Sequence, residues 1–353
     1  MNILGVMASR VIHPDRFDPY DEVAREAGFD RVLVYRPEDV NLTTGKISGF
    51  VREQGSWNKR IMNAPPITFD IGYYHDPKVV GKVRQIKNTP SIAFLNYGLG
   101  NKWMIHQKLF PFETVRPHLI PTEVVVDGKQ VMDWMERYGA VILKPINGKE
   151  GKGIVRLSKT GENGSGGPYL LEEQMNKKPL ADEQGAIHQI ERILQSGRYI
   201  VQKWIPIVNR EGLVYDVRSL VQKNQKGRWE ITGLAARQGA AGKITSNLMD
   251  GGTAFELLPY LKHHFGKKKS RKLYQKIKEL SLRIPGCLEE AYARRQADLG
   301  LDLAIDPEGE IYLIEVNVKP GKLPFRQVFG IHTKQDSIRQ PIYYAASLLG
   351  IKA

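Results

Sequence analysis

The chain has 353 residues and carries 52 lysines and arginines against 38 aspartates and glutamates, a formal net charge of +14. This length and an apolar fraction of 41% allow two or three domains with cores of their own. The single cysteine, Cys287, excludes an intramolecular disulfide and fits a reducing cytosolic setting, and no apolar run approaches the length of a membrane span.

The positive charge implies anionic partners, which could be nucleotide phosphates, nucleic acid or an acidic polymer. The densest basic run, residues 262–272 (KHHFGKKKSRK), comes without a zinc-finger, RNA-recognition or heptad signature. We therefore expect a solvated helix there and do not expect nucleic acid as the partner. The apolar run after Asn2 (ILGVM) is too short for a signal-peptide core.

The first hundred residues predict a small open-sheet domain. Apolar runs indicate strands and amphipathic runs indicate helices, in β-α-β order. The expected strands are residues 2–9, 31–35, 68–74 and 91–96, and the expected helices are residues 19–27 and 78–87. A break in the pattern at residues 97–101 (YGLGN) places the first domain boundary near residue 100.

A glycine-rich hairpin is predicted within the next hundred residues. The expected elements are helices at 102–109 and 130–138, strands at 140–143 and 154–157, and a glycine-rich loop at 148–153. The segment lacks the GxxxxGK[ST] spacing and no helix pattern follows at once, so it is neither a P-loop nor a dinucleotide fingerprint. Glycine N–H groups can still approach phosphates closely, and Lys144 could add a cation. An ordinary flexible hairpin is the alternative.

Residues 160–185 are polar and turn-rich, which predicts an excursion or a mobile hairpin rather than part of the core. After it we expect a helix at 186–195 and strands at 198–205, 213–222 and 229–236. The second of these strands carries Asp216 and Arg218, and Arg237 follows the third. Each arginine could hold a phosphate or acyl-phosphate oxygen through two hydrogen bonds. Alternatively, Asp216 and Arg218 form only a surface ion pair.

The last third of the chain predicts mainly helices. The expected elements are a glycine-containing loop at 246–252, helices at 273–282 and 288–299 interrupted at 284–286 (IPG), and a closing amphipathic helix at 338–349.

Residues 300–321, GLDLAIDPEGEIYLIEVNVKPG, predict a β-hairpin with its turn at Pro-Glu-Gly. Glu315 and Asn317 are two residues apart and share a face. Asp302 joins them if the loop has two or four residues, and lies on the other face if the loop has three. The three side chains together would offer only hard oxygen donors, the set that Mg²⁺ prefers. The alternative is a solvated polar face on an edge strand.

The order of these features resembles the ATP-grasp fold over about residues 101–345. A strand-borne lysine, a glycine-rich hairpin, an Asp-x-Arg strand, a second arginine, an Asn…Gly-Gly loop and Asp…Glu-x-Asn follow one another. Within that superfamily the sequence most resembles the YheC/YheD-type endospore coat-associated proteins of spore-forming bacilli, through the segments NKW, ILKP, GKGI, VQKWIP, YDVRSLV and LIEVNVKPG.

The resemblance implies an α+β (α/β) fold of three parts. These are a pre-ATP-grasp-like domain (1–100), a small subdomain with the glycine-rich hairpin (101–200) and a large subdomain with the metal site (201–353). ATP would contact Lys102, Lys144, Gly148, Gly151, Gly153, Gln202, Lys203 and Ile205. Mg²⁺ would be held by Asp302, Glu315 and Asn317, while Arg218 and Arg237 would be catalytic and face the γ-phosphate and the acyl-phosphate. Family hinges often carry Glu at the position of Gln202, a departure that could weaken a contact to ribose or adenine.

The implied activity is ligation of a carboxylate to an amine through an acyl-phosphate, with ATP and Mg²⁺. A kinase, or a coat-associated structural protein that binds nucleotide without turnover, are the competing hypotheses. Phosphoryl transfer needs charge neutralisation and alignment more than acid–base groups, and the chain offers no compelling Ser-His-Asp or Cys-His arrangement. The resemblance also implies a cytoplasmic or spore coat-associated protein with coat proteins as partners. The basic surplus suggests an acidic peptide as substrate.

Overall fold

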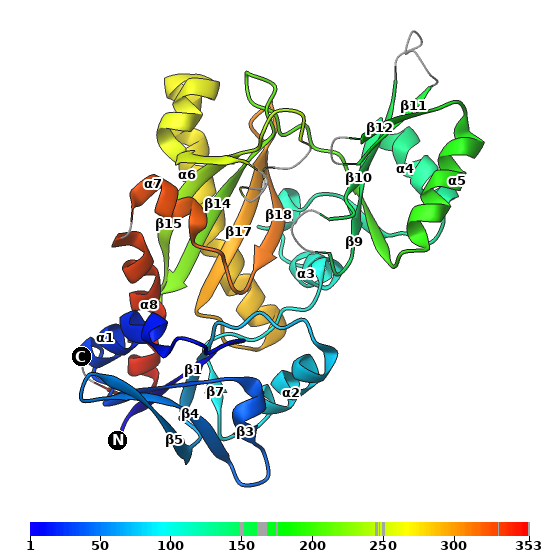
Figure 1. Cartoon of the computed structure of the whole chain (residues 1–353). Helices are drawn as coiled ribbons and strands as arrows, with labels where there is room; N and C mark the ends of the chain where they lie inside the picture. Colours follow the sequence, from blue (N-terminus) through cyan, green and yellow to red (C-terminus); the bar gives the residue numbers. More distant parts are fainter. Residues whose placement is uncertain are drawn as a thin grey trace.

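Three β-sheets organise the chain (Figure 1). The computed structural model describes residues 1–148, 152–160, 168–173, 176–243, 246, 248, 251–330 and 332–351. The order of the elements is mixed α and β, and this confirms the predicted fold class. Within the described residues, no helix has both the length and the apolar character needed to cross a bilayer.

The first sheet forms the N-terminal domain, drawn in blue in Figure 1. Its seven strands are β1 (Ile3–Met7), β2 (Arg31–Tyr35), β3 (Val40–Asn41), β4 (Lys46–Glu53), β5 (Ser56–Asn63), β6 (Ile67–Asp70) and β7 (Ala93–Phe94). Its helices are η1 (Pro14–Phe17), α1 (Asp18–Glu26), η2 (Pro37–Asp39) and α2 (Pro77–Lys87). Strands β2, β1, β6 and β7 run parallel, as the β-α-β pattern predicts. The β4–β5 hairpin was missed because β5 is a largely exposed, polar edge strand without apolar alternation.

The second sheet has six strands in the order β12-β11-β10-β9-β13-β8. The strands are β8 (Thr122–Val124), β9 (Ala140–Pro145), β10 (Val155–Lys159), β11 (Tyr169–Glu173), β12 (Asn176–Leu180) and β13 (Tyr199–Lys203). The helices that precede or follow them are α3 (Lys102–Leu109), η3 (Arg116–His118), α4 (Gly128–Tyr138) and α5 (Glu183–Leu194). Helices α4 and α5 cover one face of this sheet (Figure 1), so its other face is left for the cleft described below.

Local sequence explains why α4 and α5 form where they do. Each begins at an aspartate: the Asp127 carboxylate accepts a hydrogen bond from the N–H of Gln130, and Asp182 accepts one from Gly185. Helix α4 ends at Gly139, whose φ of +74° favours glycine. The prediction that residues 160–185 lie outside the core is wrong for strands β11 and β12, which extend the sheet and contribute Leu171 and Leu180 to its buried cluster.

The third sheet has five strands in the order β16-β15-β14-β17-β18. The strands are β14 (Tyr215–Lys223), β15 (Trp229–Gln238), β16 (Thr253–Glu256), β17 (Asp298–Ile305) and β18 (Ile311–Asn317). Helix α6 (Leu257–Tyr292) packs on this sheet, and α7 (Leu323–Phe329) and α8 (His332–Leu348) follow it in the chain. The largest apolar cluster of the described residues lies between α6 and the sheet.

Helix α6 corrects the prediction of two helices interrupted at residues 284–286. The helix continues through Pro285, and its one non-helical residue is Gly266, with φ +75°. Buried side chains at helical spacing hold the C-terminal part against the sheet, at Leu273, Ile277, Leu280, Ile284 and Leu288. The predicted helix at 288–299 is wrong beyond Tyr292, because residues from Asp298 onward form strand β17.

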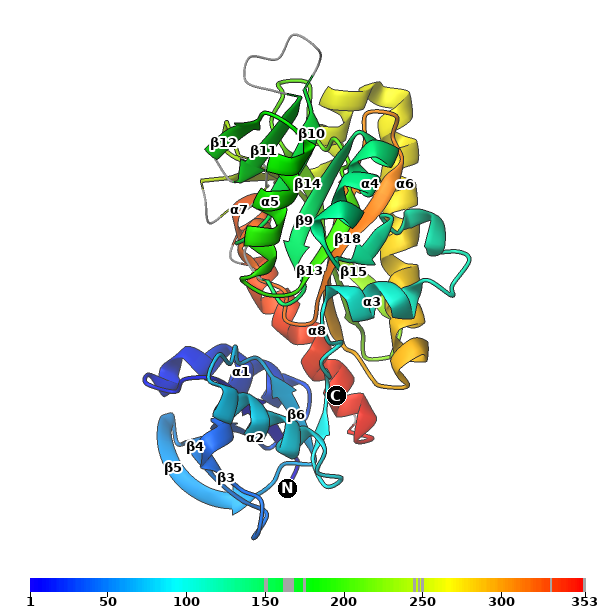
Figure 2. The ribbon, with the colours of Figure 1, turned by 90° about the vertical axis from the view of Figure 1, so that its right-hand side faces the viewer.

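Helix α8 connects the end of the chain to the first domain. Its residues Ile338, Ile342 and Ala345 belong to the same buried cluster as α1 and strand β1. Figures 1 and 2 show both termini beside the N-terminal sheet. The C-terminal helix therefore fixes the first domain against the third sheet.

Candidate functional site

A cleft of about 1250 Å³ is lined by residues of all three sheets. The second sheet contributes the face that α4 and α5 do not cover. The third sheet contributes residues of β14, β15, β17 and β18. The N-terminal domain contributes lining residues at the end of β6, in the segment that follows it and on α2. The predicted site residues that line it are Lys102, Lys144, Gly148, Gln202, Lys203, Ile205, Arg218, Arg237, Asp302, Glu315 and Asn317.

Four charged side chains on neighbouring strands form a buried network on the third sheet. Arg218 donates two hydrogen bonds to the Asp302 carboxylate, of which the second, Nη2 to Oδ2, spans 3.0 Å. Arg237 donates two to Asp216, and its Nη2 also lies 3.0 Å from Asp302 Oδ2. Ser246 Oγ donates to Asp216 at 2.6 Å. The two arginines are thus held in place by the two aspartates.

This network corrects the prediction of a surface ion pair between Asp216 and Arg218. Both residues are buried, and each pairs with a residue of a neighbouring strand rather than with the other. Burial by itself would raise the pKa of Asp302, but Arg218 and Arg237 outweigh it and hold that pKa below its usual value. Asp302 is therefore ionised at neutral pH.

A β-bulge decides which face of the hairpin Asp302 occupies. The loop between β17 and β18 has three residues, 307–309, because the backbone N–H of Asp306 donates a hydrogen bond to the carbonyl of Glu310. Loop length alone would then place Asp302 opposite Ile314 and away from Glu315. The register shifts between Asp302 and Leu303, however, so that Asp302 lies opposite Glu315. The prediction from the loop is wrong, and all three oxygen-donor residues line the cleft.

The end of the hairpin needs a glycine. Gly300 lies opposite Asn317, and a Cβ atom there would come within 2.6 Å of the Pro320 ring. The close approach of Pro320 to β17 therefore depends on the missing side chain at Gly300.

The opposite wall of the cleft follows the two-residue period of strands β9 and β13. Val141 and Leu143 point into the apolar core, so Ile142 and Lys144 point to the cleft. Lys144 is 8% exposed, and among the described residues it contacts no carboxylate. Burial lowers its pKa to about 8, which Glu315 opposes at longer range.

The side chain of Lys102 contacts both walls of the cleft. It is the first residue of α3, after the N-cap Asn101. Its ammonium group donates to the carbonyl of Gly148 in the glycine-rich loop, and lies 3.2 Å from Glu315 Oε1. Gly153, on the other side of the loop, has φ +69° and lies beside Pro145. The predicted Gly151 and residues 247, 249 and 250 of the predicted loop 246–252 lie outside the described residues.

Gln202 leaves an unpaired oxygen in the cleft wall. Thr122 Oγ1 donates to the Ile120 carbonyl at 2.7 Å, so its lone pair accepts from Gln202 Nε2, also at 2.7 Å. The amide is thereby oriented, and its buried Oε1 has no hydrogen-bond partner among the described residues. Lys203 and Ile205 follow on the same segment and line the cleft.

A second cluster in the cleft was not predicted from the sequence. Asp70, at the end of β6, lies 2.7 Å from Lys87 Nζ and 2.8 Å from Lys319 Nζ, and accepts a hydrogen bond from Tyr74 at 2.9 Å. Burial would raise the pKa of Asp70, but the two lysines hold it below its usual value. One signal was available: ligand-binding residues gather at the carboxyl ends of parallel strands, where Asp70 lies.

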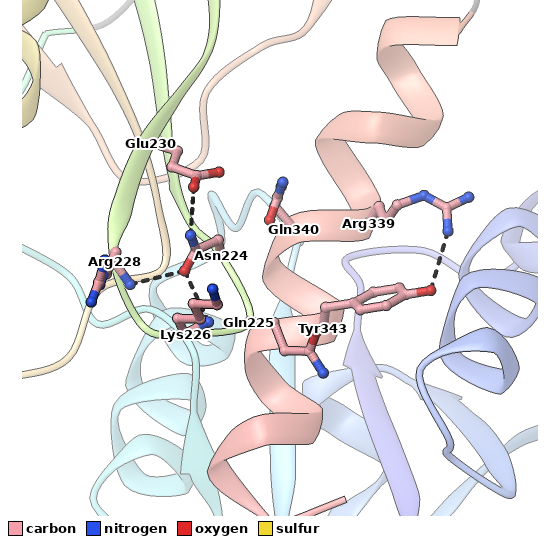
Figure 3. Close-up of a pocket in the computed structure, with 8 residues that line it drawn as sticks. All are labelled: Asn224, Gln225, Lys226, Arg228, Glu230, Arg339, Gln340 and Tyr343. Atoms are coloured by element: carbon pink, nitrogen blue, oxygen red, sulfur yellow. Dashed lines mark hydrogen bonds between the residues drawn. The ribbon is translucent and has the colours of Figure 1, made fainter. Parts of the chain in front are cut away.

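A smaller cavity of about 420 Å³ lies between the β14–β15 turn and α8 (Figure 3). Its polar groups bond to one another: Asn224 bonds to Glu230 and to the backbone of the turn, and Arg339 donates to the Tyr343 hydroxyl at 3.3 Å. None of the predicted site residues lines it. The large cleft is therefore the candidate site.

Solved structures identify the fold that surrounds this cleft as ATP-grasp. D-alanyl-alanine synthetase A from Vibrio cholerae O1 biovar eltor aligns with a TM-score of 0.58 and 11% identity, over 99% of this chain and 98% of its own. A Chryseobacterium gregarium RiPP-associated ATP-grasp ligase, solved with ADP and a leader and core peptide, aligns with a TM-score of 0.55 and 14% identity, over 98% and 96%.

The sequence comparisons are more specific. The family model for YheC/D-like ATP-grasp proteins matches residues 91–348, so the chain belongs to that family. The endospore coat-associated protein YheC of Bacillus subtilis (strain 168) is 27% identical over 335 residues, which cover 91% of this chain and 89% of the relative.

The residues of the cleft fit a magnesium–nucleotide ligand. Asp302, Glu315 and Asn317 offer carboxylate and amide oxygens from one face of the hairpin. The buried Nδ2 of Asn317 has no hydrogen-bond partner within the described part of the chain, and Gln202 Oε1 likewise lacks one. Buried polar groups are normally paired, so both sites suit a ligand that supplies the missing partners.

Proposed function

We propose that the protein is an ATP- and Mg²⁺-dependent ligase that joins a carboxylate to an amine through an acyl-phosphate. The observation that carries the proposal is the convergence of Lys102, Lys144, Arg218, Arg237 and the oxygen donors of the β17–β18 hairpin on one cleft. Phosphoryl transfer needs charge neutralisation and alignment, and these residue types supply both.

The cleft suggests a place for each part of the nucleotide. Adenine would lie against the segment from Gln202 to Ile205, where the free oxygen of Gln202 can accept a hydrogen bond from the amino group. The phosphates would lie beneath the glycine-rich loop, next to Lys102 and Lys144. Asp302, Glu315 and Asn317 would hold Mg²⁺, which when bound neutralises phosphate charge and aligns the transferred group.

The reaction would proceed in two displacements. A carboxylate oxygen of the first substrate attacks the γ-phosphorus, the bond to the β–γ bridging oxygen breaks, and ADP leaves. The amine nitrogen of the second substrate then attacks the acyl carbon, the bond from that carbon to the phosphate oxygen breaks, and inorganic phosphate leaves. The proton released by the amine passes to phosphate or solvent. Arg218 and Arg237 are held by Asp216 and Asp302 in a position to stabilise charge on the transferred phosphoryl group.

The charge of the cleft supports an acidic acceptor substrate, such as an acidic peptide. Near the N-terminal domain the cleft is lined by the cations Arg84, Lys87, Arg294 and Lys319 and by the carboxylate of Asp70, which Lys87 and Lys319 contact. An excess of positive charge in a partly enclosed cleft attracts anionic substrates.

One observation favours a second candidate, a nucleotide-binding protein without turnover. Both oxygens of Asp302 already accept hydrogen bonds from arginines, which compete with a metal ion for the same lone pairs. The relative YheC is described as endospore coat-associated. A coat-associated binder would retain the ATP site and lack ligation.

Release of inorganic phosphate separates these functions. The full chain would be incubated with ATP, Mg²⁺ and a panel of acidic peptides, with and without amino acids as amines. A ligase releases phosphate only when both substrates are present, and mass spectrometry shows the amide product. A kinase yields ADP and a phosphorylated acceptor without free phosphate. A binder yields neither. ATP turnover only with uncharged acceptors would exclude the acidic-substrate proposal.

Glu315→Gln tests the metal site directly. The substitution removes a carboxylate charge and little volume, so turnover should fall by about 100-fold or more with the fold intact. The matched control is Glu308→Gln, the same change at an exposed position of the same hairpin, which should keep wild-type turnover. Wild-type activity in Glu315→Gln would contradict the assignment of the hairpin.

A further inference from the structure

Three metal-ligating side chains meet outside the cleft, where the turn between β13 and β14 lies against α6. They are Glu211 of the turn and the adjacent His263 and His264 of the helix, whose ligand atoms all lie within 4.8 Å of one another. His263 Nε2 lies 3.0 Å from one oxygen of Glu211, and His264 Nδ1 lies 3.7 Å from the other. One carboxylate thus faces two imidazoles.

The turn that carries Glu211 is fixed by the buried Asn209. Its Oδ1 accepts hydrogen bonds from the N–H groups of Glu211, at 3.1 Å, and Leu213, at 2.8 Å. Its Nδ2 donates to the Tyr260 hydroxyl at 3.1 Å. Tyr260 lies one helical turn before His264 on α6, so the same asparagine shapes the turn and docks it on the helix.

The ring of His264 is held equally firmly. It packs against Tyr260 and Tyr215, with ring centroids 4.3 Å and 6.2 Å away. Its Nδ1 accepts a long hydrogen bond, 3.4 Å, from the backbone N–H of Arg210, so the lone pair of Nδ1 points towards the turn. The same atom faces the Glu211 carboxylate. A cation bound between Nδ1 and the carboxylate would take this lone pair in place of the long hydrogen bond from Arg210.

We propose that Glu211, His263 and His264 bind one divalent transition-metal ion with the ligand preferences of Zn²⁺. Two imidazole nitrogens and a carboxylate are typical Zn²⁺ ligands, whereas Mg²⁺ favours an all-oxygen set such as that of the cleft. The ion replaces the proton shared between His263 and Glu211. Both of these side chains are largely exposed, so water completes the coordination.

The place of this site in the fold gives it a structural role. Gln238 Oε1 accepts hydrogen bonds from Asn209, at 2.8 Å, and from Tyr260, at 3.1 Å. Gln238 directly follows Arg237 of the buried network. The turn directly follows the segment from Gln202 to Ile205 in the cleft wall. A metal ion that ties the turn to α6 therefore braces the connection between the second and third sheets.

Titration of the metal-free full chain with Zn²⁺ tests the proposal. The experiment uses calorimetry in millimolar Mg²⁺, which occupies the oxygen site of the cleft, and thermal unfolding with saturating Zn²⁺. We expect one Zn²⁺ per chain and a rise in Tm of about 2–4 °C. With Cu²⁺ as the probe, electron paramagnetic resonance should show hyperfine coupling to two imidazole nitrogens.

His263→Ala and Glu211→Gln should each weaken Zn²⁺ binding by at least about tenfold and remove the Tm shift, because each deletes a ligand. Both positions are exposed, so neither change threatens the fold. His188→Ala removes an exposed histidine of α5 outside the cluster and should leave binding unchanged. The proposal is overturned if Zn²⁺ does not bind, if it binds without one-to-one stoichiometry, or if His263→Ala retains wild-type affinity; the cluster is then a plain hydrogen-bonded pair.

Discussion

The two walls of the cleft differ in how their charges are balanced. On the third sheet, two arginines and two aspartates neutralise one another through hydrogen bonds between neighbouring strands. On the second sheet, Lys144 is buried without contact to a carboxylate among the described residues, and Gln202 keeps a buried oxygen unpaired. The charged groups of the first wall thus pair with one another, whereas the second wall holds a buried ammonium group and an amide oxygen that lack such partners among the described residues.

The difference shows which residues the fold needs and which the function needs. A buried charge network is held together by its partners, and loss of one member leaves another charge uncompensated. Burial of a lysine without a partner reduces the stability of the fold. Groups with a pKa shifted in this way are typical of functional sites. We therefore expect substitutions in the buried charge network to lower stability as well as turnover, and substitutions of Lys144 and Gln202 to affect mainly nucleotide binding.

The largest effect is expected for Asp302→Asn. The change leaves the shape of the side chain but removes the only carboxylate that Arg218 contacts among the described residues, whereas Arg237 keeps Asp216. Removal of one partner of a buried pair costs about 3 kcal/mol, which urea denaturation would measure.

The double variant Asp302→Asn with Arg218→Met serves as the control for this prediction. The second substitution removes the Arg218 charge that Asp302→Asn leaves uncompensated. The double variant should therefore recover at least half of the lost free energy of unfolding. A single variant within about 1 kcal/mol of wild type would show that the network contributes little to the fold.

A smaller effect, on affinity, follows from the pKa of Lys144. Burial lowers this pKa to about 8, so the ammonium group is present below that pH and lost above it. ATP affinity, measured by calorimetry, should therefore fall about tenfold between about pH 7 and about pH 9. Lys144→Arg carries a guanidinium that stays charged, so its affinity should be independent of pH in this range. The same slope in both proteins would mean that Lys144 does not contact the phosphates.

Strand patterns in the sequence located the backbone of one wall. The strands expected at 140–143 and 198–205 are present, and their two-residue period puts Ile142, Lys144 and Gln202 on one face of the sheet. The order of motifs was likewise sufficient to identify the ATP-grasp fold. Both are local properties, and local sequence encodes them.

The arrangement of side chains on the third sheet depends on tertiary contacts that local sequence does not encode. The bulge beside Asp302 reverses the face predicted from the loop, and the pairing of Arg218 with Asp302 depends on which strands are neighbours in the sheet. Helix α6 continues through Pro285 because its buried face, formed on folding, outweighs the local break. The cluster of Glu211 with His263 was missed for the same reason, since the turn and the helix meet only in the tertiary structure.

Gln202→Leu should have a modest effect on nucleotide selectivity. In the proposed binding mode the free Oε1 accepts a hydrogen bond from the adenine amino group, and loss of one such bond would weaken binding about fivefold. Inosine triphosphate lacks that amino group, so its affinity should be the same in wild type and variant. Equal losses for both nucleotides would show that the change disturbs the Thr122 contact rather than recognition of adenine.

The smallest effect is expected at an ion pair far from both walls. Lys159 of β10 and Glu136 of α4 form a close pair, but their side chains are 46% and 69% exposed. Water and salt screen such a pair, and the ordering of two long side chains offsets most of the attraction. Glu136→Gln should therefore leave both Tm and ATP affinity unchanged. Both Glu136 and Asp302 are carboxylates paired with cations, but they differ strongly in burial, so a shift in Tm of several degrees for Glu136→Gln would contradict burial as the main cause of the difference.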